Sequence, residues 1–160
     1  MENITKTFFL RFFVIMIAMF SPFFCILYSG ELDSYSEYWQ TDTRPLFIFT
    51  NAATSYFLFS INKWRIPAIC LMLLTAFSFD QYFWVHNITA ICFFVASLIS
   101  ISLSKKNQYY VLPYLLSIIV LLESGILWGE ICAITVICAF HLHRLIRYYR
   151  IDIKRKNYRL

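Results

Sequence analysis

The segment Thr7–Tyr28, TFFLRFFVIMIAMFSPFFCILY, contains one charged residue, Arg11, in an otherwise apolar run. An α-helix needs about 20 predominantly apolar residues to cross the hydrocarbon core of a bilayer. The run is longer than the apolar region of a secretory signal peptide, and no Ala-x-Ala-type cleavage site follows it. The segment is therefore predicted to be a retained membrane-spanning helix.

Five further apolar runs follow, separated by polar links, and they predict a bundle of six short helices. The predicted spans are residues 7–28, 45–61, 66–79, 83–103, 110–122 and 129–145. Hydrophobic residues make up 60% of the chain and charged residues 14%, whereas a soluble domain carries roughly 25% charged residues. We therefore predict an all-α, polytopic transmembrane bundle forming a single membrane domain over residues 1–160. Two spans, 66–79 and 110–122, are shorter than about 17 residues, so a re-entrant segment is an alternative there.

The distribution of basic residues predicts the orientation of this bundle. With the N-terminus inside, the inner segments hold thirteen of the fourteen basic residues, and only Arg44 lies outside. Basic residues are enriched in cytoplasmic loops, so we expect both termini in the cytoplasm and the chain in the cell (inner) membrane. This frame gives an outer loop at residues 29–44 and a basic cytoplasmic tail at residues 146–160. Seven basic residues from Arg144 to Arg159 follow an apolar run, which indicates attraction to anionic lipid rather than to nucleic acid.

Polar and ionisable residues collect at the outer end of the predicted bundle. Such groups are expensive at membrane depth, and they usually face a bundle interior or a wet cavity. We expect them to bind a lipid headgroup or a small polar ligand. The ligand-binding candidates are Ser34, Ser36, Tyr38, Asp42, Arg44, Asp80, His86, Asn87, Glu123 and Glu130.

Other readings of these residues remain open. They are solvated ends of short hairpins, or an ion-pair network around Arg44, whose guanidinium can hold carboxylates in bidentate fashion. A metal site of Asp80, His86 and Glu123 is a weaker alternative, because zinc accepts three such side chains, yet the spacing of these residues is not diagnostic. His141 and His143 point to different sides of a helix, and no cofactor is predicted.

Two stretches carry a resemblance to a known group of membrane proteins. SYSEYWQTDTRPLF at residues 34–47 and DQYFWVHNITAICFF at residues 80–94 resemble small bacterial membrane proteins similar to the FRAG/DRAM/Sfk-like family of six-helix proteins. Trp39 departs from the pattern, which has a second Tyr there. The resemblance implies an association with lipid, since eukaryotic relatives are linked to lipid remodelling and to lysosomal or autophagic membranes. The matching positions are Ser34, Ser36, Tyr38, Thr41, Arg44, His86, Asn87, Ala90 and Phe93.

The sequence thus predicts a multi-pass membrane protein that binds a ligand at its outer face and carries out no reaction. Membrane lipid is the expected partner, with a second copy of the chain or another membrane protein as alternatives. Two other functions stay open. One is a membrane-embedded, metal-dependent lipid hydrolase, and the other is a channel or an accessory subunit of a membrane complex.

Overall fold

The computed structural model describes residues 2–157, and it describes the side chains of residues 6–151. Within residues 2–157 the chain forms α-helices and short 3-10 helices and no strand. The all-helical prediction is confirmed for this part of the chain. The helices are α1 (Glu2–Ser29), η1 (Tyr35–Gln40), α2 (Arg44–Phe59), η2 (Asn62–Trp64), α3 (Arg65–Ala76), α4 (Phe83–Ser102), η3 (Gln108–Tyr110), α5 (Val111–Ser124) and α6 (Ile126–Asn157).

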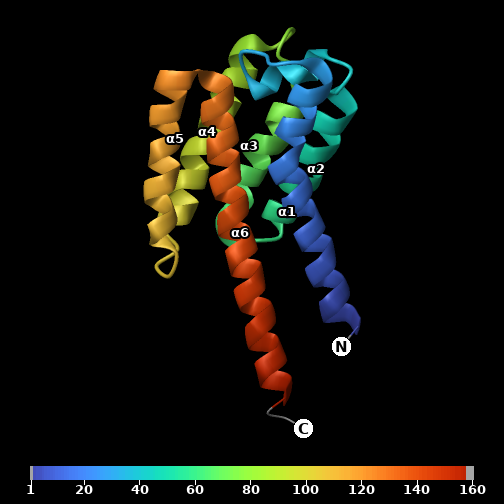
Figure 1. Cartoon of the computed structure of the whole chain (residues 1–160), viewed down its shortest axis with the longest axis vertical. Helices are drawn as coiled ribbons and strands as arrows, with labels where there is room; N and C mark the ends of the chain where they lie inside the picture. Colours follow the sequence, from blue (N-terminus) through green and yellow to red (C-terminus); the bar gives the residue numbers. More distant parts are fainter. Residues whose placement is uncertain (1, 158–160) are drawn as a thin grey trace.

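The α-helices run up and down in one bundle (Figure 1). α6 packs against α5 and α1, α2 lies between α1 and α3, and α4 packs chiefly on α3. The start of α1 and the end of α6 lie at the same end of the bundle, and η1 lies at the opposite end, above the start of α2 (Figure 1). We call these the terminal end and the η1 end.

Three helical segments are long and apolar enough to cross a membrane: Lys6–Ser29, Phe83–Ser102 and Ile126–Ile151. The segment Gln108–Ser124 is apolar but shorter. Large apolar side chains such as Leu27 and Leu122 are exposed on the outside of the bundle, with 82% and 76% of their surface accessible. Since soluble monomers rarely expose large contiguous apolar patches, this surface agrees with a lipid environment.

The structure corrects three details of the predicted layout. α1 and α6 are not short, because they have 28 and 32 residues. α6 also begins before residue 129 and continues through the predicted tail as far as Asn157. The residues after 145 include no Gly or Pro and are rich in Arg and Lys, which favour helix, whereas the prediction used the end of the apolar run as the end of the helix. Finally, the loop at residues 29–44 contains the helix η1.

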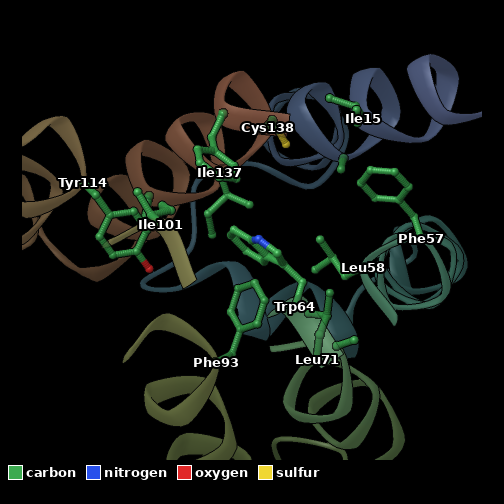
Figure 2. Packing of buried hydrophobic residues seen from close by; sticks show 14 residues of the cluster. Ile15, Phe57, Leu58, Trp64, Leu71, Phe93, Ile101, Tyr114, Ile137 and Cys138 are labelled. Atoms are coloured by element: carbon green, nitrogen blue, oxygen red, sulfur yellow. The ribbon is translucent and has the colours of Figure 1, made fainter. Parts of the chain in front are cut away.

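Buried apolar residues form two clusters, one toward each end of the bundle. The cluster nearer the terminal end surrounds Trp64 of η2, which is fully buried. Figure 2 shows its indole among Leu58, Leu71, Phe93 and Ile137, which come from α2, α3, α4 and α6. The cluster nearer the η1 end includes Cys25, Tyr35, Tyr38, Phe47, Leu74, Ala90, Leu127 and Ile131. A short link can therefore hold four long helices together through one aromatic side chain.

Two glycines shape the junction of α5 and α6. Gly125 has a φ of +96°, a conformation that other residues rarely adopt, and it reverses the chain between the two helices. One turn later, Gly129 lies directly against α5: a Cβ atom on Gly129 would clash with the Cβ of Leu121 and lie 2.7 Å from its Cα. The sequence-based expectation that Gly129 permits close helix approach is therefore confirmed.

Gly129→Ala should destabilise the protein, because the added methyl group meets backbone atoms of α5 that cannot move aside independently. Overpacking of this kind costs about 1–3 kcal/mol, and each kcal/mol lowers Tm by about 2–4 °C in a chain of this size. Thermal unfolding in mild detergent measures the change. Ser124→Ala, an exposed position at the end of α5, is the control and should leave Tm unchanged. Equal Tm values for the wild type and Gly129→Ala would contradict the close packing of these helices.

Candidate functional site

The segment Gly30–Thr43, which we call the outer segment, is tied to three helices at the η1 end. The Tyr38 hydroxyl donates to the carbonyl of Gly30 over 2.7 Å, and the Trp39 indole N–H donates to the carbonyl of Thr75, at the end of α3, over 3.3 Å. The backbone N–H of Leu127 in α6 donates to the carbonyl of Asp33 over 3.0 Å. These bonds hold the outer segment across the end of the bundle as a fixed cap.

Tyr35 extends from this cap into the bundle. Its backbone N–H donates to Oε2 of Glu130 in α6 over 2.7 Å, and its hydroxyl lies 2.9 Å from Oγ of Ser21 in α1. The side chain is buried, and burial raises the pKa of Tyr35, so the phenol stays protonated and can donate. Tyr35 therefore links the outer segment to both long helices.

Ser21 lies beside a proline in the middle of α1. Pro22 has no N–H, so the carbonyl of Ala18 loses its usual helical partner. The Ser21 hydroxyl lies 3.4 Å from that carbonyl oxygen and donates to it. In this arrangement the Tyr35 hydroxyl is the donor to Ser21. Polar contacts inside α1 thus replace a backbone bond that lipid cannot provide.

Beneath the outer segment lies a cavity of about 50 Å³, which we call the central cavity. A buried water needs roughly 10–15 Å³ of such space, so the cavity has room for about four water molecules or a ligand with a similar number of heavy atoms. Part of its wall is apolar, with side chains such as Leu71, Phe93 and Ile137. The polar residues that line it are Ser21, Tyr35, Ser36, Thr50, Asn51, Thr54 and Glu130.

Three polar atoms of α2 at this cavity are buried and have no hydrogen-bond partner: Thr50 Oγ1, Asn51 Nδ2 and Thr54 Oγ1. A buried polar group without a partner costs about 1–3 kcal/mol, so three on one helix face are a substantial cost. Across the cavity, Glu130 uses Oε2 for the Tyr35 N–H, and the structure gives its other oxygen no protein partner. The central cavity therefore offers one carboxyl group, one amide and several hydroxyls to an occupant.

The structure brings two of the predicted candidates, Ser36 and Glu130, to the central cavity. Ser34 and Tyr38 instead bond within the outer segment, where the Ser34 hydroxyl donates to Glu37 Oε1 over 3.4 Å. The guanidinium of Arg44 lies 3.7 Å from the centre of the Trp39 ring, a cation–π contact. These three residues hold the cap in place.

The remaining candidates lie apart from the central cavity. Asp80 accepts a hydrogen bond from the Gln40 side chain, and His86 Nδ1 lies 2.8 Å from the carbonyl oxygen of Phe77. Asp42 and Glu123 are exposed, and Asn87 is half-buried. Among the described side chains, no group of three or more His, Cys, Asp or Glu is placed to hold a metal ion, and Asp80, His86 and Glu123 form no such group.

The sequence reasoning missed Ser21, Thr50, Asn51 and Thr54, because it searched only the helix ends. A signal was present: Thr50, Asn51 and Thr54 stand at positions i, i+1 and i+4 of an apolar span and so share one helix face. Polar residues grouped in this way in a membrane helix usually face the interior.

Tyr38→Phe should loosen the cap, because it removes the bond to the Gly30 carbonyl while keeping the buried ring. A net loss of about 1 kcal/mol corresponds to about fivefold faster opening of the outer segment. Hydrogen exchange of the amides at residues 31–42, followed by mass spectrometry, measures this opening. Tyr28→Phe, at a side chain with 75% of its surface exposed, is the matched control. Unchanged exchange in Tyr38→Phe would show that this bond does not hold the segment.

Comparisons with known proteins leave the fold and the site to be interpreted from this chain's own residues, because no protein-family model, no curated protein and no solved structure matches it.

Proposed function

We propose that this chain is a multi-pass cell-membrane protein that binds a small amine-bearing polar ligand in the central cavity and catalyses no reaction on it. The observation that carries the proposal is the set of three buried, unpartnered polar atoms on α2 opposite Glu130. An occupant that hydrogen-bonds to these atoms offsets the cost of burying them.

The chemistry of the lining suggests the class of ligand. A carboxylate in an apolar surrounding favours a cationic partner, such as a primary ammonium group. Asn51 Nδ2 requires an acceptor, and the hydroxyls of Thr50 and Thr54 can bond to either kind of group. With room for about four heavy atoms, the cavity suits ethanolamine, either free or as the headgroup of a phospholipid.

The proposal includes six crossings with both termini in the cytoplasm. The basic residues Lys63, Arg65, Lys105 and Lys106 lie in the links at the terminal end, which agrees with the positive-inside rule. α2 and α3 have 16 and 12 residues, so they span the bilayer only together with their flanking links. In this frame the central cavity lies in the outer half of the membrane.

The other functions have less support. No described cluster favours a metal-dependent hydrolase. A channel or an accessory subunit needs a continuous polar path or a partner surface, and the apolar exterior is explained by lipid alone. The resemblance of residues 34–47 and 80–94 to the FRAG/DRAM/Sfk-like group agrees with a lipid-related ligand.

Ethanolamine should stabilise the purified wild-type protein in detergent. A ligand present at about 100 times its Kd adds about 2.7 kcal/mol, which corresponds to a rise in Tm of about 5–10 °C in a chain of this size. Glu130→Gln keeps an acceptor for the Tyr35 N–H but removes the charge, so it should abolish the rise. Asn51→Leu should reduce the rise, because it removes the amide.

Glu123→Gln is the charge-matched control, since this exposed carboxylate lies at the same end of the bundle. It should respond to ethanolamine like the wild type. 1-Propanol, which lacks the amine, should stabilise none of the variants. An equal rise in the wild type and in Glu130→Gln would rule out the central cavity as the amine site.

The proposed topology predicts the activity of reporter fusions in a bacterial host. Alkaline phosphatase fused after Asp42 should be active, because this residue lies outside the cytoplasm in the proposed frame. The same reporter fused after Leu160 should be inactive, whereas green fluorescent protein at that position should fluoresce. The reverse pattern would exclude both termini from the cytoplasm.

A further inference from the structure

A second pocket, which we call the terminal pocket, lies between α1, α6 and the end of α2. It has a volume of about 300 Å³ and opens toward the terminal end of the bundle. None of its nine lining residues is acidic, and two of them, Arg11 of α1 and Arg144 of α6, carry a positive charge. The pocket therefore brings two cations from the two long helices to one space without a lining carboxylate.

Arg144 is held in place by aromatic neighbours. Its guanidinium carbon lies 5.5 Å from the centre of the Phe140 ring and 5.8 Å from that of Tyr148, and its Nη2 lies 3.5 Å from the Tyr148 hydroxyl. None of these contacts neutralises its charge. Arg144 thus has a fixed direction and hydrogen-bond donors available for an anion.

His141 is a second, independent sign of a ligand at this pocket. It lines the pocket with only 4% of its surface exposed, and its Nε2 has no hydrogen-bond partner. The ring is locked between Trp64 and Phe57, with ring centres 4.3 and 5.4 Å away. A buried imidazole nitrogen without a partner costs free energy that a bound group can recover.

We propose that the terminal pocket binds a phosphate group, supplied by an anionic phospholipid of the adjacent leaflet. Arg11 and Arg144 contact the phosphate oxygens, and the side chains of Ser60 and Asn62 lie on the same wall. The apolar lining residues Phe57, Ile61 and Leu145 face the glycerol and the start of the acyl chains. Basic pockets between membrane helices at the cytoplasmic side suit such headgroups. The site is separate from the central cavity and does not depend on its ligand.

The test compares lipid binding by charge-matched variants in nanodiscs of phosphatidylcholine with a minor fraction of phosphatidylglycerol. Native mass spectrometry measures how much phosphatidylglycerol stays bound relative to phosphatidylcholine. Each basic residue near an anionic membrane surface contributes about fivefold in affinity, so Arg11→Gln/Arg144→Gln should lower this enrichment at least about fivefold. His141→Phe, which keeps the aromatic packing, should lower it by a smaller factor.

Arg65→Gln/Lys105→Gln is the control, because both residues are exposed in links at the terminal end and neither lines the pocket. It should retain the enrichment of the wild type. An equal loss in both double variants would mean that lipid responds only to diffuse charge, and no loss in either would mean that the pocket binds no anionic lipid. Each of these results overturns the proposal.

The same variants distinguish lipid phosphate from free phosphate. Thermal unfolding of delipidated protein is measured with soluble inorganic phosphate and with short-chain phosphatidylglycerol. We expect the lipid to raise Tm of the wild type and not of Arg11→Gln/Arg144→Gln, and inorganic phosphate to leave both unchanged. An equal stabilisation of the wild type by inorganic phosphate would overturn a lipid as the source.

Discussion

Lipid cannot hydrogen-bond to a polypeptide, and this constraint accounts for the distribution of polar groups throughout the bundle. Its exterior is covered by apolar side chains such as Leu27 and Leu122, while Glu130, Asn51 and the Thr side chains of α2 turn inward. Even the gap that Pro22 leaves in α1 is repaired from within, by the hydroxyl of Ser21. In such a solvent, each buried polar group needs a protein partner or an occupant.

The outer segment shows how a polar stretch becomes part of this arrangement. It is not a free loop, because Tyr35 carries it into the bundle and Tyr38 and Trp39 fasten it to its own start and to α3. The unpartnered atoms around the central cavity stand out against this otherwise complete bonding. Sites where buried polar groups stay unsatisfied are where stability has been given up, and binding is the common reason.

α6 connects the two proposed sites. Glu130 lines the central cavity and Arg144 lines the terminal pocket, and fourteen residues of one helix separate them by about 21 Å. Between them the helix packs through Ile137 and Phe140 into the cluster around Trp64. One rigid element therefore positions the carboxylate near one face of the proposed membrane frame and the guanidinium near the other.

Apolar runs and basic links by themselves determined that this chain is helical and suited to a membrane, because the cost of exposing polar groups to lipid acts on every residue of a span. They did not determine the length of α6, since helix propensity continues beyond the apolar run to Asn157. Only the tertiary structure decided which polar residues meet. Ser36, Thr50 and Glu130 are far apart in the sequence, and the packing of η1, α2 and α6 gathers them at one cavity, while Asp80, His86 and Glu123 share an end of the bundle without forming a metal-ligand group. Side-chain direction around a helix and contact between helices set that difference, and a single sequence shows the first only in part and the second not at all.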